Sequence, residues 1–369
     1  MRVLNKTILL TLIVICVLGL CVGCSDESEL GKLKDKEILK AINSTCDKYF
    51  NEKEFVGMSV AIIKDGNVAY LNYGKTSVDV EKVTKNTIYE IASLSKPFAG
   101  SLLAFESLQG KVSLDDSVNK YADYLKSYEY KDSVMTLKHL ATHSSGLPRM
   151  PRNWSSGPNP YKNYTKEKLI TFLSKNTLHR KPGTLYEYSN LGFGLLGCIL
   201  EDVEGCTYED LLKKNIFDPL NMKSTAIYLS EQLQARKALP YLTGSTKGYE
   251  WDFDALKACA GIKSSTRDLA RFIAANLGQI ECDEELQKAF DLAKEVHFSG
   301  KQTIGLGWRL AKVKNKTIHE HDGLASGYTS YYALDIENGF GVVVLCNSAD
   351  GVIDLGTSLM EMLMSEYGK

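Results

Sequence analysis

Segments with strand-like patterns lie toward both ends of this chain, and a mostly helical block separates them. Residues 56–74 form two apolar stretches joined by Asp65-Gly66, a dipeptide typical of tight β-hairpin turns. From Ser93 to about Leu200 the apolar residues recur mostly at helical spacing. Strand patterns return near the end, and helical spacing follows them; the strand segments are 303–313, 316–321, 327–336 and 339–349, and the helical segment is 351–368.

This order constrains the fold, because strands near the two ends must pair with each other to bury their apolar faces. We expect an α/β protein of the α+β type, with one antiparallel sheet flanked by helices. The block over roughly residues 97–255 is expected to form a mostly helical lobe. A cleft between the sheet and this lobe is the default position for a ligand site.

Composition limits the classes of partner. The chain has 369 residues, of which 44% are hydrophobic and 24% charged, so it is long enough to bury a large core. Its formal net charge is −1 and it has no long basic run. These values exclude the electrostatic footprint of a nucleic-acid-binding protein.

The N-terminus resembles a bacterial export signal. Arg2 and Lys6 precede an apolar run over residues 8–22, which is short for a membrane span. Gly23-Cys24 resembles a lipoprotein cleavage site, although Cys21 stands where such sites usually have Leu. We expect residues 1–23 to be a signal peptide, with Cys24 as the lipidated residue. A plain secretory signal and an uncleaved anchor helix are the alternatives.

On this interpretation the protein is exported and held by lipid at a membrane of the bacterial cell envelope. Residues 24–50 would form a tether and an amphipathic helix, followed by one domain over residues 51–369. Six cysteines lie beyond the signal, without CxxC pairs or metal-ligand spacing. We expect them to be small buried hydrophobic residues; they are Cys46, Cys198, Cys206, Cys259, Cys282 and Cys346.

The stretch "YEIASLSKPFAG" (89–100) places Ser93 and Lys96 about one helical turn apart. A serine hydroxyl is a poor nucleophile until a base takes its proton, and a desolvated lysine amine can be that base. Pro97 is tolerated in the first turn of a helix, and the backbone N–H groups of that turn can stabilise an oxyanion. The spacing alone is weak evidence, because Ser117 and Lys120 have the same spacing on an expected solvent-exposed helix face.

Two further elements strengthen the case. Tyr188 and Asn190 begin an apolar helix after a Pro-Gly turn, where the phenol can relay a proton and the amide can bind a substrate carbonyl. Tyr161 and Asn163 have the same spacing but lie in a polar loop, and we discount them. A tyrosine packed in the core, with its hydroxyl at the rim, is the alternative for Tyr188.

The second element is "HEHDGLASGYTSYY" (319–332), where His321-Asp322-Gly323 lies on or beside an expected strand. Gly323 would let a substrate backbone approach the strand edge closely. His321 could also be a purely structural histidine. His319 and His321 would share one strand face, which raises a zinc site as an alternative, but two histidines without further ligands make a thin case.

Together, "YEIASLSK", "YSN" and "HDG" resemble, in order, three motifs of the serine β-lactamase / penicillin-binding-protein superfamily, in its class C-like branch. Other stretches match in style, and the similarity covers roughly residues 50–350. Ala92 stands where the first motif often has Gly, and His321 replaces the lysine of Lys-Thr-Gly. The resemblance implies a β-lactamase/transpeptidase-like fold, with no metal and no organic cofactor.

The resemblance also implies roles. Ser93 would be acylated, Lys96 would be its general base, and Tyr188 would carry a proton to the leaving group. His321 would lie beside the oxyanion site, formed by the backbone N–H groups of Ser93 and Leu324. Asn190 and Gly323 would bind the substrate.

The histidine at position 321 changes the expected substrate. A lysine there is a permanent cation that can hold a carboxylate, whereas an exposed histidine is largely neutral near pH 7. We therefore expect an exported serine hydrolase that cleaves an ester or a D-amino-acid-containing peptide amide. A class C-like β-lactamase acting on a lactam carbonyl is one alternative, and a non-hydrolytic penicillin- or cell-wall-binding protein is another. The 144–164 loop is expected to form a wall or lid of the site.

Overall fold

The computed structural model describes residues 30–78, 80–122, 129–131 and 133–368. The predicted signal peptide over residues 1–23 and the predicted lipidation site at Cys24 lie outside these residues. Within the described ranges, every helix is too short or too polar to cross a lipid bilayer.

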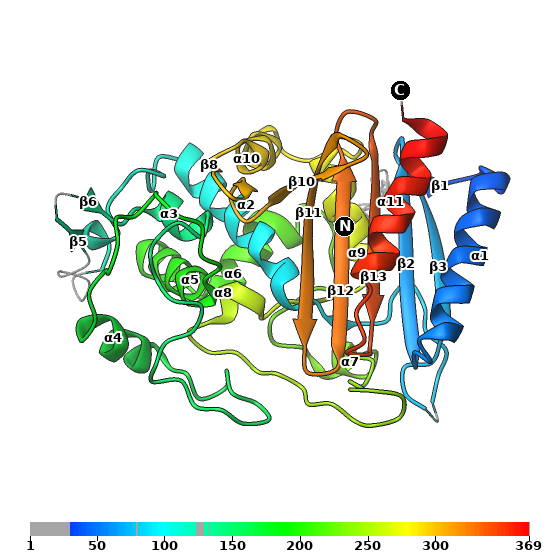
Figure 1. Ribbon diagram of the computed structural model, residues 1–369, viewed down its shortest axis with the longest axis horizontal. Coiled ribbons are helices and arrows are strands. Elements are labelled where there is room, and N and C mark those ends of the chain that lie inside the picture. Colours follow the sequence, from blue (N-terminus) through cyan, green and yellow to red (C-terminus); the bar gives the residue numbers. More distant parts are fainter. Residues whose placement is uncertain (1–29, 79, 123–128, 132, 369) are drawn as a thin grey trace, which may run out of the picture.

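A nine-stranded sheet forms one side of the molecule (Figure 1). The strand order is β1-β3-β2-β13-β12-β11-β10-β9-β8. In chain order these strands are β1 (Gly31–Lys32), β2 (Gly57–Lys64), β3 (Asn67–Gly74), β8 (Phe298–Ser299), β9 (Thr303–Ile304), β10 (Arg309–Val313), β11 (Lys316–Ala325), β12 (Tyr328–Asp335) and β13 (Phe340–Cys346). The pairing of β2 with β13 joins the two ends of the chain, so the prediction of one sheet built from both ends is confirmed.

The sheet departs from the expected antiparallel arrangement at one edge. The two-residue strand β1 pairs with β3 in parallel, whereas the other neighbouring strands pair antiparallel. A pairing of two residues leaves too short a pattern of alternation to be recognised in the sequence. The predicted turn at Asp65-Gly66 is confirmed, since β2 and β3 flank it, and a second turn over residues 336–339 joins β12 to β13.

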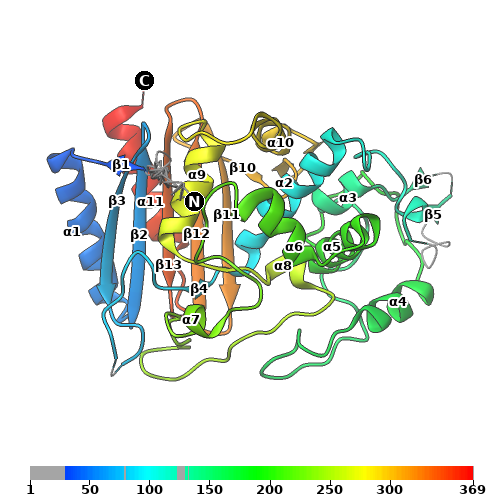
Figure 2. The same ribbon diagram turned by 180° about the vertical axis from the view of Figure 1, so that it is seen from behind.

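Helices cover both faces of the sheet. α1 (Lys36–Glu52) and α11 (Ile353–Tyr367) pack on one face, where their apolar side chains meet those of β2 and β13. α9 (Thr266–Asn276) covers the opposite face, and Figure 2 shows it in front of the strands. Successive side chains of a strand point to opposite faces, which explains why β2 and β13 are apolar almost throughout.

The helical lobe lies beside the β11 side of the sheet (Figures 1 and 2). Its helices are α2 (Ser95–Leu108), α3 (Leu137–Ala141), α4 (Lys166–Ser174), α5 (Asn190–Glu204), α6 (Tyr208–Leu212) and α8 (Lys257–Ala260). α10 (Glu284–Lys294) packs against α2, and the short α7 (Glu231–Gln234) lies at the end of the sheet (Figures 1 and 2). Two small sheets complete the chain, β4 (Tyr89–Glu90) with β7 (Lys263–Ser264) and β5 (Glu129–Tyr130) with β6 (Ser133–Val134). One hydrophobic core joins this lobe to the inner face of the sheet, so the two parts are held together by packing.

The expectation that all six later cysteines are buried is only partly correct. Each of the six is a free thiol. Four are buried, but Cys206 is exposed and Cys282 is partly exposed. Cys206 follows Gly205, which ends α5 in the left-handed conformation, so its side chain lies on a surface turn outside the apolar stripe of the helix.

Candidate active site

A short turn holds Ser93 at the entrance to the helical lobe. A single 3₁₀ turn, Ala92–Leu94, links β4 to α2. Ala92 is buried and has φ of +47°, a left-handed conformation that costs a small side chain less than a β-branched or bulky one. The Ser330 hydroxyl of β12 donates to the carbonyl of Ile91 at 2.8 Å, so the sheet fixes this turn directly.

Lys96 lies on the first turn of α2, and its side chain is fully buried. Its Nζ lies 3.0 Å from Ser93 Oγ, 2.9 Å from Asn190 Oδ1 and 2.8 Å from the Cys259 carbonyl oxygen. The structure therefore brings Ser93, Lys96 and Asn190 together, as the sequence predicts. The Cys259 carbonyl was not anticipated, because a backbone acceptor leaves no trace in residue type.

Burial lowers the pKa of Lys96 to about 7, and the nearby cations Arg149 and Arg309 act in the same direction. A neutral amine has two N–H groups and one lone pair. The two fixed acceptors, Asn190 Oδ1 and the Cys259 carbonyl, match the two N–H groups. The lone pair is then free to face Ser93 Oγ. In its neutral form Lys96 is thus oriented to accept the hydroxyl proton of the serine.

Tyr188 approaches Ser93 from the other side. Its hydroxyl lies 2.7 Å from Ser93 Oγ, and burial raises its pKa, so the phenol remains protonated at neutral pH. Ser189 caps α5 by accepting from the Gly192 N–H, which fixes the residue before the helix. The helix cap therefore positions both neighbours of Ser189, Tyr188 and Asn190.

His143 is a residue of this site to which the sequence pattern assigned no role. Its buried ring lies 4.3 Å from the ring of Tyr188, and its Nδ1 accepts from the Ser189 N–H at 2.9 Å. Its carbonyl accepts from the Glu187 N–H at 2.8 Å, so His143 holds the backbone on both sides of Tyr188. Burial lowers the pKa of His143 well below its ordinary value, which keeps Nδ1 unprotonated and able to accept.

The 144–164 loop forms a wall of the site. The prediction that this loop is polar is partly wrong. The loop binds the start of α5, since the Arg149 carbonyl accepts from the Asn190 N–H at 3.0 Å. Tyr161 is buried in an aromatic cluster against Trp251 and Phe253. The sequence did not predict the burial of Tyr161, because the loop around it is rich in Gly, Pro and Asn and its apolar partners come from a distant segment.

Strand β11 forms the opposite wall and passes close to the Ser93 turn. A Cβ added to Gly323 would lie 2.4 Å from the Ile91 carbonyl oxygen and 2.3 Å from Ser330 Oγ. The missing side chain of Gly323 therefore makes room for the turn that carries Ser93. This differs from our expectation that the glycine makes room for a substrate backbone.

Two hairpin turns determine where the backbone of Leu324 points. Each turn has two residues, Lys314-Asn315 and Ser326-Gly327, and the residues that flank such a turn form a hydrogen-bonded pair. Counting from both turns, the even-numbered residues of β11 direct their N–H groups toward β10. β10 begins at Arg309, which pairs with Glu320, so the Leu324 N–H points past its end to an open edge.

His321 is buried, which corrects the assumption of an exposed histidine. Burial lowers its pKa well below the ordinary value, so the ring is neutral at pH 7. Its Nδ1 lies 2.7 Å from the carbonyl oxygen of Asp322, which can only accept, so Nδ1 carries the proton. Nε2 of His321 is consequently an acceptor.

Charges on the β11 wall are largely paired among themselves. Arg309 forms an ion pair with Asp322 and lies 3.5 Å from Glu320. His319 faces away from this group and its Nε2 contacts the Lys294 carbonyl at 2.9 Å. Within the described ranges, no three His, Cys, Asp or Glu side chains come together as a metal site.

Ser117 and Lys120, the second Ser-x-x-Lys pair, lack the buried environment that surrounds Ser93 and Lys96. Ser117 accepts from the Asn119 N–H as the cap of a 3₁₀ turn, and Lys120 forms an exposed ion pair with Asp116 at 2.9 Å. Lys120 and Ser117 therefore serve as a matched comparison for Lys96 and Ser93.

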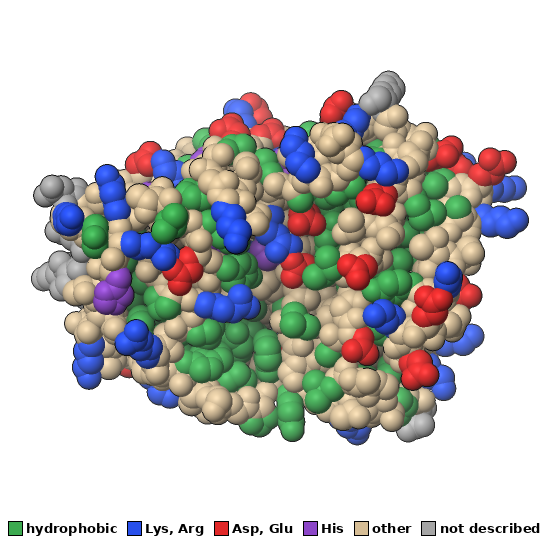
Figure 3. All heavy atoms as spheres, viewed as in Figure 1, with side chains coloured by type: hydrophobic (Ala, Val, Ile, Leu, Met, Phe, Trp, Pro, Cys, Tyr) green, Lys and Arg blue, Asp and Glu red, His purple; other side chains and the backbone are tan. Residues whose placement is uncertain are grey.

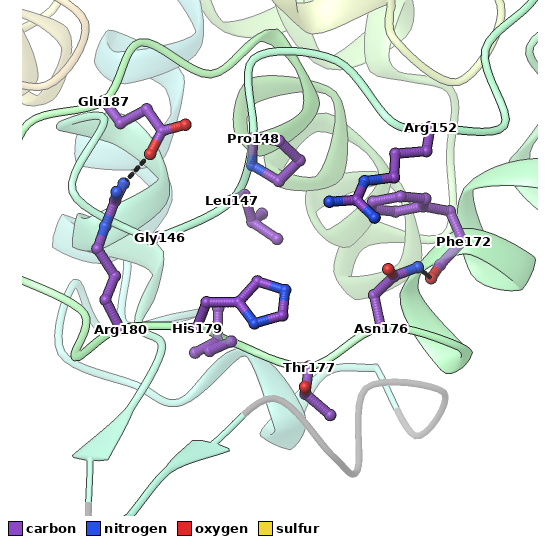
Figure 4. Close-up of a pocket in the computed structure, with 11 residues that line it drawn as sticks. Gly146, Leu147, Pro148, Arg152, Phe172, Asn176, Thr177, His179, Arg180 and Glu187 are labelled. Carbon is purple, nitrogen blue, oxygen red and sulfur yellow. Dashed lines mark hydrogen bonds and ion pairs between the residues drawn. The ribbon is translucent and has the colours of Figure 1, made fainter.

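A cavity of about 280 Å³ lies beside the chain segments that lead to Arg149 and Tyr188 (Figure 4). Pro148 and Glu187 line it, and each is followed in the chain by a residue of the site, Arg149 and Tyr188. Arg152 and His179 point into the cavity from opposite sides (Figure 4).

Comparison with known proteins agrees with this architecture. The family model described as Beta-lactamase matches residues 42–356. A β-lactamase of Yersinia enterocolitica is 28% identical over 286 residues, covering 76% of this chain and 71% of the relative.

Solved structures match over most of their length. A class C β-lactamase in complex with cefoxitin superposes with a TM-score of 0.80 at 25% identity, covering 89% of this chain and 98% of that one. A β-lactamase/D-alanine carboxypeptidase of Pseudomonas syringae has a TM-score of 0.77 at 23% identity, covering 89% and 98%, and this supports the fold alone. The chain belongs to the β-lactamase family of serine hydrolases.

Proposed function

We propose that this serine hydrolase cleaves an ester or a D-amino-acid-containing peptide amide through an acyl-enzyme formed on Ser93. The observation that carries the proposal is the environment of Lys96. Its two fixed acceptors leave the lone pair of the neutral amine for Ser93, and burial lowers its pKa to about 7. A general base with a pKa near the working pH is the most effective one.

Acylation follows from these contacts. Neutral Lys96 takes the hydroxyl proton as Ser93 Oγ attacks the substrate carbonyl carbon, and the carbonyl oxygen becomes an oxyanion. The N–H of Ser93, at the start of a helix, and the N–H of Leu324, at the open edge of β11, are the proposed donors to that oxyanion. When the tetrahedral intermediate collapses, the bond to the leaving group breaks and Tyr188 supplies the proton that this group needs. Tyr188 is then reprotonated from Lys96.

Deacylation reverses these roles. A water molecule loses its proton to the Tyr188–Lys96 pair and attacks the ester carbonyl of the acyl-enzyme. The bond to Ser93 Oγ then breaks, and the serine recovers its proton. The amide of Asn190 orients the acyl group, and Gly323 shapes the strand edge beside it. This assignment requires neither a metal ion nor an organic cofactor.

The choice of substrate rests on His321. A neutral ring whose Nε2 is an acceptor offers no cation to the carboxylate of a β-lactam. This favours esters and peptides that do not depend on a cation at that position. Direct contact of Ser93 with both Lys96 and Tyr188 argues against a protein that only binds penicillin.

A β-lactam is the second candidate substrate. Its support is the family itself and the similarity to a class C β-lactamase that is described in complex with cefoxitin. On this alternative, another cation of the cleft would have to hold the lactam carboxylate.

We further propose that the protein is exported and anchored in the bacterial cell envelope through a lipidated Cys24. The support is the order of basic residues, apolar run and Gly23-Cys24 at the N-terminus. Mass spectrometry of the N-terminal peptide tests this directly, since an unmodified Cys24 in the membrane fraction would contradict it.

The test of function compares three substrates with the full-length protein in detergent: p-nitrophenyl acetate, a D-alanyl-D-alanine peptide and benzylpenicillin. We expect kcat/KM to be lowest for the lactam, and Ser93→Ala to abolish hydrolysis of the ester and the peptide. Ser117→Ala is the matched control and should have no effect. Hydrolysis that survives in the Ser93→Ala variant would refute the nucleophile, and a lactam rate above the other two would favour the β-lactamase alternative.

A further inference from the structure

Two arginines face the catalytic groups, and they differ in whether a carboxylate neutralises them. Arg309, on the β11 wall, is paired with Asp322 and lies near Glu320. Arg149, on the loop wall, is exposed and has no carboxylate partner among the residues that the structure describes. Its guanidinium group lies 4.9 Å from the centre of the Tyr188 ring. Arg149 is thus a cation available at the mouth of the site.

The β11 wall cannot take an anion in the same way. The lone pair of His321 Nε2 repels a carboxylate or phosphate oxygen, because the Asp322 carbonyl holds the ring proton on Nδ1. Asp322 itself adds a negative charge to that wall, and Arg309 is already engaged with it. The two walls therefore differ in what they offer to a charged substrate.

The distribution of charged residues along the chain also distinguishes the loop wall from the β11 wall. Residues 144–190 contain eight Lys and Arg and only two Asp and Glu, a formal charge of +6 in a chain whose net charge is −1. In the space-filling view, Lys and Arg side chains gather over the helical lobe on the left, while Asp and Glu are more frequent over the sheet on the right (Figure 3). Such an asymmetry attracts anions to one side of a cleft.

The loop also extends this positive wall beyond the catalytic groups. Arg152, three residues after Arg149, points into the 280 Å³ cavity, whose floor includes Leu147 and Phe172 (Figure 4). Arg180, at the edge of the cavity, is paired with Glu187. The loop side of the molecule therefore offers a second cation, beside apolar side chains.

We propose that the natural substrate is anionic and that Arg149 binds its carboxylate or phosphate group from the loop side of the cleft. This inference rests on the proposed acyl-transfer function and names the substrate class for it. A guanidinium group can hold either anion with two parallel hydrogen bonds. Arg149 is then a specificity-determining residue, which carries out the anion recognition that His321 does not provide.

The experiment measures the preference for charge with two matched pairs of esters and the full-length protein in detergent. In the first pair the acyl group is neutral or charged: p-nitrophenyl butyrate against the mono-p-nitrophenyl ester of glutaric acid. In the second pair the leaving group is neutral or charged: methyl 4-acetoxybenzoate against 4-acetoxybenzoate. Only the part of the rate that is lost in Ser93→Ala is counted. If no such part exists, the proposed function fails, and this outcome is distinct from the absence of a charge preference.

We expect kcat/KM to favour the charged ester in at least one pair by about tenfold, the value of one charge-assisted hydrogen-bonded pair. Arg149→Gln should remove this preference mainly through KM, and Arg149→Lys should keep part of it. The pair that responds identifies the side of the scissile bond that carries the anion.

Lys162→Gln is the matched control. Lys162 is an exposed cation of the same loop, paired with Asp252 at 3.6 Å, and its loss should leave the preference unchanged. Equal rates within both pairs in the wild type would overturn the proposal. A preference that is the same in Arg149→Gln as in the wild type would also overturn it.

Discussion

The two walls of the cleft are built differently. On the β11 wall, Arg309 and Asp322 neutralise each other, and a backbone carbonyl fixes the tautomer of His321. On the loop and α5 wall, a neutral histidine and a helix cap hold Tyr188, while Arg149 has no carboxylate partner within the described ranges. Lys96 lies between the walls and contacts Ser93 directly.

The two walls therefore have different roles in the proposed mechanism. The β11 wall supplies geometry, since its open edge presents the Leu324 N–H beside the Ser93 turn. The loop wall holds Tyr188, the proposed proton carrier, and Arg149, a cation without a carboxylate partner in the described part of the chain. Substitutions on the β11 wall should therefore affect the transition state for all substrates, whereas substitutions of loop cations should affect the choice among substrates.

The largest effect is expected from the group between the walls. Lys96→Ala removes the base, so acylation of Ser93 at neutral pH should fall by about 10³-fold, within the range for loss of a general base. Stopped-flow release of p-nitrophenol measures this step. Lys120→Ala, in the exposed second pair, should change nothing. Acylation at the wild-type rate in Lys96→Ala would show that another group takes the proton.

The geometry of the β11 wall can be broken at Gly323. Gly323→Ala places a Cβ against the Ile91 carbonyl and Ser330, so β11 must move away from the Ser93 turn. We expect kcat to fall by about 10²-fold for all substrates, because misplacement by about 1 Å costs that much. Stability should fall by about 1–3 kcal/mol.

Kinetics and urea unfolding measure these two effects in the same preparation. Gly351→Ala is the control for a glycine-to-alanine change without a steric clash. Gly351 lies on a loop with positive φ and open space where a Cβ would be, unlike Gly323 in β11, so its substitution should cost stability through backbone strain and leave kcat unchanged. A normal kcat in a folded Gly323→Ala variant would contradict the proposed role of the β11 edge.

The loop wall can be tested at His143. His143→Phe keeps a ring beside Tyr188 but removes the acceptor for the Ser189 N–H, and we expect kcat to fall by about tenfold with little change in KM, because a buried donor is left unpaired. His143→Asn supplies an acceptor near the position of Nδ1 and should recover part of kcat.

Thermal unfolding is measured for both variants, since a purely structural role would lower stability without this difference in kcat. Equal kcat in the two variants would contradict positioning of Tyr188 by the Nδ1 acceptor.

The smallest effect is a displacement of the pH profile. Protonated Lys96 cannot accept a proton, so kcat/KM for a neutral ester should fall below pH 7 and rise as the pH increases through about 7. Arg149 and Arg309 lower the pKa of Lys96, and Asp322 raises it. Asp322→Asn should therefore move the acidic limb to lower pH.

His143 and His321 also face this region, but burial lowers their pKa values well below the ordinary range, so both are neutral across this limb. The assignment to Lys96 would be contradicted if the acidic limb of the profile did not move in Asp322→Asn. It would also be contradicted if the limb were still present in Lys96→Ala.

Local patterns predicted more of the site than of its surroundings. The spacing of Ser93 and Lys96 fixes their proximity within one helical turn, and Tyr188 with Asn190 follows from a helix start. The contacts that tune these groups come from residues far apart in the sequence. The Cys259 carbonyl reaches Lys96 from 163 residues away, and no property of a cysteine side chain predicts that contact.

The same limit applies to the fold. Long apolar segments identified the sheet, but the two-residue strand β1 was too short to recognise. The burial of Tyr161 and His321 depends on which segments pack over them, and residue type does not specify this. The sequence pattern assigned no role to His143, whose ring the structure places beside Tyr188.

The mass of the acyl-enzyme shows directly whether Ser93 is the nucleophile. The full-length protein in detergent is mixed with a p-nitrophenyl ester, quenched in acid during turnover, and analysed intact and after proteolysis. We expect one added acyl group, located on Ser93 and absent from Ser93→Ala. An acyl group on another residue, or the same adduct in Ser93→Ala, would contradict this expectation.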